Sequence, residues 1–225
     1  MGVDFIDLAL SIEETFEIEM SVETFGETLT VGQLHDYIVQ RTSIARPGTC
    51  LTSAAFYHIR SGLAECEIKE RFGPSTDLES VIPKQDRRSL WKRFSRQMNL
   101  DLPDLVRPPV VVILAAVVTI ALTAIIAYAS SWHSLVGLIS LMVLSLLAVG
   151  GTRPFATRFA DDWSTFRGLS ERVLTLNAKE LRKEHGPMGL NDTWVVLKGL
   201  VVEALGVEAD EVTREASFVK DLGCS

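Results

Sequence analysis

A long apolar stretch dominates the hydrophobic pattern of this chain. Residues 108–152 contain no Asp, Glu, Lys or Arg, and the stretch is about twice as long as the roughly 20 residues that cross a bilayer core. The polar residues 130–134 include an interfacial Trp and form a natural turn in its middle. The pattern therefore predicts a transmembrane hairpin of two helices over residues 110–150. A hairpin buried in a soluble core is the alternative, but a chain this small has little protein to cover it.

Basic residues beside this stretch predict its orientation. Arg107 precedes the first span, Arg153 and Arg158 follow the second, and the turn between them has no Lys or Arg. The positive-inside rule then puts both termini in the cytoplasm, with the hairpin in the inner (cytoplasmic) membrane. The N-terminal residues lack the basic and apolar regions of a secretory signal.

Helical periodicity describes the rest of the chain, and no segment has a convincing strand pattern. Thr30 is the expected N-cap of a helix whose apolar face holds Leu34, Tyr37 and Ile38. Further helices are expected near the N-terminus and over residues 53–66, 86–98, 165–181 and 193–205, the last capped by Asn191 or Asp192. The predicted class of the soluble part is all-α.

The formal net charge of −7 is unevenly distributed along the chain. Residues 1–46 carry nine acidic and two basic residues, and residues 188–225 carry seven and three. The middle of the chain, residues 47–187, carries thirteen acidic and seventeen basic residues. Two acidic ends around a basic, membrane-flanking middle suggest that the ends belong together.

Motifs for catalysis and metal binding are not legible in the sequence. The cysteines at positions 50, 66 and 224 are far apart and form no Cys-x-x-Cys pair. The four histidines stand singly, which favours surface or packing roles over metal binding: His35, His58, His133 and His185. Without a nucleophile–base pair or a Gly-rich phosphate loop, no enzyme and no catalytic residue are expected. The acidic ends argue against a nucleic-acid partner.

The last segment, residues 188–225, resembles the first half of an acyl carrier protein. Residues 201–207 follow the first helix of that family, and residues 211–218 and 221–223 follow its long loop. In the family, the Asp-Leu-Gly sequence seen here at 221–223 is followed within a few residues by Asp-Ser-Leu. The serine of that motif carries 4′-phosphopantetheine, whereas the present sequence ends at Cys224-Ser225.

The first segment, residues 1–45, looks like the second half of the same carrier domain. Residues 8–20 resemble its acidic second helix, and residues 30–38 resemble the start of its last helix. The order of the halves is inverted, and the break falls at the phosphopantetheine attachment point. The resemblance therefore implies a carrier fold that is circularly permuted or split, which two ends on one membrane face would permit.

The basic helical region of residues 50–107 looks like a second, degenerate carrier copy. Its expected parts are a first helix at residues 55–60, a loop at 74–79 and a second helix starting at 88–91. In the returning region, residues 153–183, the sequence after Thr165 repeats the pattern of the sequence after Thr30. The hairpin would then be inserted before the last helix of this copy. Chance similarity between helical segments of mixed charge is the alternative.

The sequence departs from the carrier family at the attachment serine. Alignment through residues 2–4 puts Phe5 at the serine position, and alignment back from Phe16 puts Gly2 there. Neither residue can be esterified, so the 4′-phosphopantetheine cofactor is disfavoured. Ser225 would lie near the site if the ends meet, and Ser89 of the middle copy stands in an Arg-rich context unlike that of the family.

Two charged helices are the candidate contact surfaces. The acidic residues of the first helix would form a partner surface that binds basic patches: Asp4, Asp7, Glu13, Glu14, Glu17 and Glu19. An ordinary solvated face is the alternative for this set. The basic residues of the helix at 86–98 would flank the membrane and attract anionic headgroups: Arg87, Arg88, Lys92, Arg93 and Arg96. Docking on the chain's own acidic helix, or on a true carrier protein, is the alternative for them.

These observations lead to three interpretations of the function. The preferred one is a membrane-anchored pseudo-carrier, a non-modifiable docking or scaffold module for the enzymes of fatty-acid or polyketide-type metabolism. The second is a functional phosphopantetheine carrier, and the third is a membrane interaction protein unrelated to acyl transfer. The expected partners are membrane lipids, together with acyl-chain enzymes or another carrier protein.

Overall fold

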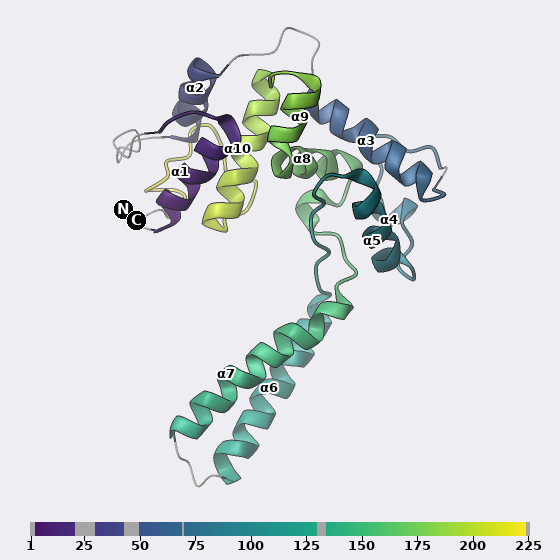
Figure 1. Ribbon diagram of the computed structural model, residues 1–225. Helices are drawn as coiled ribbons and strands as arrows, with labels where there is room; N and C mark the ends of the chain where they lie inside the picture. Colours follow the sequence, from purple (N-terminus) through teal and green to yellow (C-terminus); the bar gives the residue numbers. More distant parts are fainter. Residues whose placement is uncertain (1–2, 21–29, 43–49, 69, 130–133, 224–225) are drawn as a thin grey trace. The chain divides into compact units, whose positions relative to one another are not determined.

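The computed structural model describes residues 3–20, 30–42, 50–68, 70–129 and 134–223. The chain divides into two compact units (Figure 1). The first unit consists of residues 1–81, 93–103 and 162–225, and the second of residues 82–92 and 104–161. Every regular element within the described ranges is a helix, which confirms the all-α prediction.

In the first unit, the two ends of the chain form one group of helices, here called the α10 group. α1 (Val3–Phe16) and α2 (Val31–Arg41) both pack against α10 (Leu190–Leu205). The side chains that make this core are at most 1% exposed: Leu8, Ile12, Phe16, Leu34, Ile38, Val196, Leu197 and Val201. The ends thus bury one another's apolar faces, and the structure brings them together as the charge pattern suggested.

The middle of the chain forms a second group of the first unit, here called the α3 group. Its helices are α3 (Leu51–Glu65), α4 (Leu78–Val81), α8 (Phe166–Leu176), α9 (Ala178–His185) and the C-terminal half of α5 (Arg87–Met98). α8 and α9 contact α3. α5 approaches α3 at Gly62, where an added Cβ would lie 2.8 Å from the ring of Phe94. A larger residue at this position would separate the two helices.

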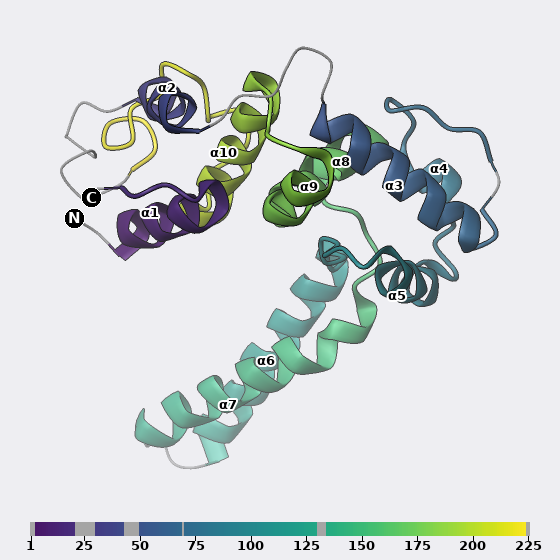
Figure 2. The same ribbon diagram turned by 45° about the horizontal axis from the view of Figure 1, so that its top comes forward.

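The two groups are joined through α10, which also packs against α8 (Figure 2). Gly199 of α10 permits this approach, because a Cβ there would lie 2.6 Å from Oγ1 of Thr175. Arg172 of α8 and Glu203 of α10 form an ion pair of 3.0 Å across the same contact. Burial raises the pKa of the nearby helix residue Glu171, against the lowering effects of Arg167 and Lys198.

Asp192 in the first turn of α10 caps the N-terminus of α3. Its carboxylate accepts hydrogen bonds from the backbone N–H groups of Leu51 (2.9 Å) and Thr52 (3.2 Å) and from the Thr52 hydroxyl (2.8 Å). The prediction that Asn191 or Asp192 caps α10 is therefore wrong. α10 begins at Leu190, and the Asp192 side chain serves another helix.

The start of α2 pairs with the loop that follows α10. Thr30 is the N-cap, as predicted, and it forms a reciprocal capping box with Gln33. The next two residues pair with the loop, because Val31 N–H donates to Ala216 O (3.0 Å) and Gly32 N–H donates to Arg214 O (2.9 Å). This pairing fixes the loop after α10 against the start of α2.

The start of α8 repeats the same local structure in the α3 group. The N-cap Thr165 accepts a hydrogen bond from Gly168 N–H (3.2 Å). Phe166 N–H donates to Thr76 O (3.1 Å), and Arg167 N–H donates to Pro74 O (2.8 Å). Four buried positions also correspond: Val31, Leu34, His35 and Ile38 in α2, and Phe166, Leu169, Ser170 and Val173 in α8. The two groups therefore share this pairing between the start of a helix and a loop.

The single helix predicted over residues 165–181 is interrupted at Asn177. Its buried side chain binds the backbone of Asp101 in both directions, donating to the carbonyl (2.8 Å) and accepting from the N–H (2.7 Å). It also donates to Val173 O (2.8 Å). A new helix, α9, begins after this residue, because Asn177 leaves the helical conformation to make these bonds.

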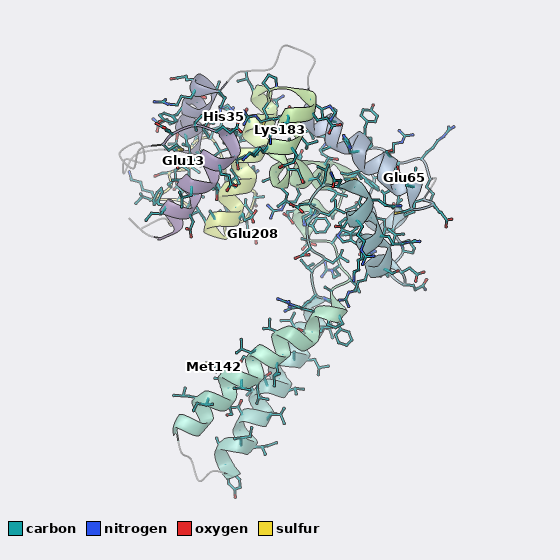
Figure 3. The ribbon with its side chains drawn as sticks, viewed as in Figure 1. Glu13, His35, Glu65, Met142, Lys183 and Glu208 are labelled. Atoms are coloured by element: carbon teal, nitrogen blue, oxygen red, sulfur yellow. The ribbon has the colours of Figure 1, made fainter. Side chains whose placement is uncertain are left out.

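The second unit contains two long apolar helices, α6 (Pro109–Ala129) and α7 (Ser134–Thr152), which pack against each other. Residues 109–128 and 138–155 are each long and apolar enough to cross a membrane. Their apolar side chains are almost all exposed, as Met142 shows at 62% (Figure 3). This exposure contradicts a hairpin buried in a soluble core, and it is what a lipid-facing surface requires.

The chain segments entering and leaving this hairpin are tied together by Arg87. Its guanidinium donates to Thr157 O (2.7 Å) and Ile82 O (2.9 Å) and lies 4.3 Å from the ring centre of Phe159. Arg87 is fully buried, so its assignment to a headgroup-facing basic set is wrong. The other members of that set are exposed: Arg88, Lys92, Arg93 and Arg96.

Several sequence-based expectations lie outside the described residues. They concern the linker at residues 46–49, the turn at residues 130–133, Gly2 and Ser225. The backbone of Asp4 belongs to α1, but its side chain is not described.

Cysteine labelling tests the expected topology, and the structure selects the reporter. Cys66 is buried, its thiol donates to Gln97 (2.7 Å), and burial raises its pKa, so it would resist labelling on either side of a membrane. Cys50 is exposed and is the better reporter. In sealed cells that carry Ser131→Cys, an impermeant maleimide should label residue 131 and leave Cys50 untouched until the cells are permeabilised. Labelling of Cys50 in sealed cells, mapped by peptide mass spectrometry, would contradict cytoplasmic termini.

Candidate functional site

The start of α1 is where the carrier resemblance would place the attachment serine. One of the two alignments puts Phe5 at this position, and the side chain of Phe5 is 7% exposed. Its ring lies 5.8 Å from the ring of Phe218, in the loop after α10, at an interplanar angle of 53°. A tilted aromatic pair of this kind adds to the stability gained from burial. Phe5 is therefore part of the core that joins the two ends of the chain.

The Asp-Leu-Gly sequence, residues 221–223, follows shortly after Phe218 in the chain. Local hydrogen bonds hold it in place. The carboxylate of Asp221 accepts from Ser217 N–H (2.8 Å), and Ser217 O accepts from the N–H groups of Asp221 (3.0 Å) and Leu222 (3.1 Å). Leu222 is buried, and Gly223 has a φ of 70°, a conformation that favours glycine. The end of the loop is thus a turn that is held by hydrogen bonds between residue 217 and residues 221 and 222.

The acidic residues of α1 do not form one free surface. Glu13 (Figure 3) is half-buried, and its carboxylate accepts from Met20 N–H (2.7 Å). Glu17 lies 3.5 Å from the guanidinium of Arg182, which also donates to Thr15 O (3.0 Å) at the end of α1. Asp7, Glu14 and Glu19 are exposed. Asp7 and Glu14 are therefore the members best placed to meet a partner.

Asp7 and Glu14 line an open cavity of about 570 Å³ in the first unit. α1, α10 and the junction of α8 and α9 form its walls. Five carboxylates and one lysine face it: Asp7, Glu14, Asp101, Glu180, Glu203 and Lys179. A cavity with this excess of negative charge attracts cationic groups and disfavours anionic ones.

A basic surface that the sequence analysis missed lies next to the end of α1. Lys179, Arg182 and Lys183 of α9 line a hollow of about 280 Å³ together with Glu17. The ion pair between Arg182 and Glu17 belongs to this surface. Among the described residues, the basic helix that contacts α1 is thus α9. From the sequence, this contact is expected only as the alternative role of the helix at 86–98. The short length of α9 and its mixed charges hid it in the sequence.

Two of the four histidines come together in space, which corrects the expectation that they stand singly. His58 of α3 and His185 of α9 approach each other beside Glu184. These three side chains are the group within the described ranges that could hold a metal ion. His35 behaves as a packing residue, as expected: it is 2% exposed, and its Nε2 lies 3.2 Å from Leu190 O.

No family model matches the sequence. No solved structure matches it either.

Proposed function

We propose that this protein is a membrane-anchored pseudo-carrier, a docking module with a carrier-like fold that bears no phosphopantetheine arm. The observation that carries the proposal is the burial of Phe5 against Phe218. Phe5 is the apolar residue that one alignment puts at the position of the attachment serine. A transferase needs an accessible hydroxyl at this point. A buried aromatic ring has no such group and stabilises the fold instead.

The repeated local structure supports the carrier-like part of the proposal. In each group a threonine N-cap begins the last helix, and the two residues after it pair with the loop that follows the first helix. Two groups in which a helix start pairs with a loop in the same way are expected of a duplicated domain. On this account the hairpin is an insertion in the second copy, and the first copy is permuted.

Membrane attachment through α6 and α7 supports the role of a scaffold at a lipid surface. We assign the hairpin to the inner membrane, with both termini in the cytoplasm, on the strength of Arg107, Arg153 and Arg158. The exposed basic side chains of α5, Arg88 and Lys92 among them, would bind anionic headgroups at about 1 kcal/mol per charge. The soluble helices would then be held where membrane-associated acyl-chain enzymes work.

The cavity beside α1 supplies the partner surface in this proposal. Its carboxylates would receive a basic patch of an acyl-chain enzyme, with Asp7 and Glu14 at the contact. In this proposal the protein catalyses no reaction, and its acidic surface binds the partner protein.

Resistance to loading tests the pseudo-carrier directly. The full-length protein in detergent, incubated with a broad-specificity phosphopantetheinyl transferase and coenzyme A, should keep its intact mass, because Phe5 offers no hydroxyl. Phe5→Ser should also remain unloaded, because position 5 is buried in the core of the α10 group. A genuine acyl carrier protein in the same reaction is the positive control. A phosphopantetheine adduct on the wild-type chain, at Ser225 or Ser89, would establish the functional carrier instead.

Charge reversal tests the partner surface. Asp7→Lys and Glu14→Lys should each weaken binding to a purified acyl-chain enzyme that normally docks a carrier protein. We expect a loss of about fivefold per substitution, equivalent to about 1 kcal/mol. Glu70→Lys, an exposed acidic residue outside the cavity, is the matched control. Added salt should reduce the difference between wild type and variants. Binding that is indifferent to both substitutions and to salt would favour the membrane interaction protein without a carrier role.

A further inference from the structure

α9 packs beside α3 (Figure 1). Two histidines and a glutamate from these helices converge there. The Nε2 atoms of His58 and His185 lie 3.2 Å apart. Oε1 of Glu184 lies 3.7 Å from Nε2 of His58 and 3.9 Å from Nε2 of His185. The side chains of the two histidines are about one-third exposed, at 34% and 32%, so an ion from solvent can reach them.

The distances between these three ligand atoms are close to those in a zinc site. Zinc binds imidazole nitrogen at about 2.0–2.1 Å, so two ligands of a tetrahedral site lie about 3.3 Å apart. The two imidazoles already meet this distance, and the carboxylate needs to move by only a few tenths of an ångström.

The backbone around the three ligands is fixed by contacts that do not involve them. α3 is capped by the Asp192 carboxylate, and its buried residues Ala55 and Ile59 lie on the face that packs in the first unit. α9 is anchored by the fully buried Leu181. It ends at His185 because Gly186 takes a φ of 95°, with its N–H donating to Arg182 O (2.9 Å). Ligands on two packed helices are preorganised for binding, which lowers the entropic cost of assembling the site.

We propose that His58, Glu184 and His185 form a binding site for a divalent transition-metal ion, with Zn²⁺ as the ion that fits best. Two imidazoles and one carboxylate suit zinc and disfavour Mg²⁺ and Ca²⁺, which prefer all-oxygen sites. Water would complete the coordination on the exposed side. Because the ligands come from α3 and α9, the ion would fasten these helices together and stabilise the first unit.

Calorimetric titration of the full-length protein, in detergent and without a histidine tag, tests the site. Zn²⁺ should bind with one ion per chain and raise the thermal midpoint, and EDTA should reverse the shift. His58→Gln and His185→Gln should each weaken binding by about tenfold or more and abolish the thermal shift. Glu184→Gln should weaken it less, since the two imidazoles remain.

His133→Gln is the matched control, because it removes a histidine that lies far from this cluster in the sequence. Its zinc affinity should equal that of the wild type. Co²⁺ should give the visible absorption of a tetrahedral nitrogen–oxygen site in the wild type and lose it in His58→Gln. Failure of the wild type to bind zinc would overturn the proposal. So would zinc binding that is equally tight in His58→Gln and His185→Gln. Neither result bears on loading with phosphopantetheine or on partner docking.

Discussion

The carboxylate of Asp192 joins the two halves of the first unit. It is 3% exposed and accepts three hydrogen bonds of 3.2 Å or less from Leu51 and Thr52, at the positive end of α3. Hydrogen bonds to a charged group contribute about 1.5–3 kcal/mol, and a buried carboxylate that lost them would be costly. The Asp192 carboxylate thus fixes the start of α3 directly on α10, in addition to the packing of both helices on α8. α10 in turn carries α1 and α2, so the bond links the ends of the chain to its middle.

The two groups of the first unit are held together at several points, which bears on the proposed function. The two groups have the same local structure at Thr30 and Thr165, and they are held through α10 and α8 by Gly199 and the Arg172–Glu203 ion pair. A carrier that delivers a swinging arm needs an exposed attachment point. In the proposed pseudo-carrier, the alignment that puts Phe5 at this point gives a buried phenylalanine there, which suits a module that presents a fixed surface. The acidic cavity formed by α1, α10 and the α8–α9 junction is such a surface.

The sequence was informative wherever the signal was local. The absence of charge over residues 108–152 predicted the two long apolar helices, and Thr30 predicted its helix start through the capping box. Prediction from the sequence failed where a polar side chain binds residues that are distant in the sequence. Arg87 looks like its exposed neighbours Arg88 and Lys92, yet it binds carbonyl groups brought to it by residues 82 and 157. Asp192 looks like a cap of its own helix, and Asn177 looks like an ordinary helix residue. The pairing of His58 with His185 joins positions 127 residues apart, and nothing in either local sequence indicates it.

The central claim is that the ends of the chain fold as one core on α10. Hydrogen–deuterium exchange on the full-length protein and on a chain lacking residues 188–225 tests it most directly. The account predicts that the amides of α1 exchange slowly in the full chain and lose their protection in the truncated one, because Phe16 and Leu8 lose the helix that buries them. The amides of α6, in the second unit, should be equally protected in both chains and serve as the internal control. Slow exchange of α1 that persists in the truncated chain would contradict the shared core.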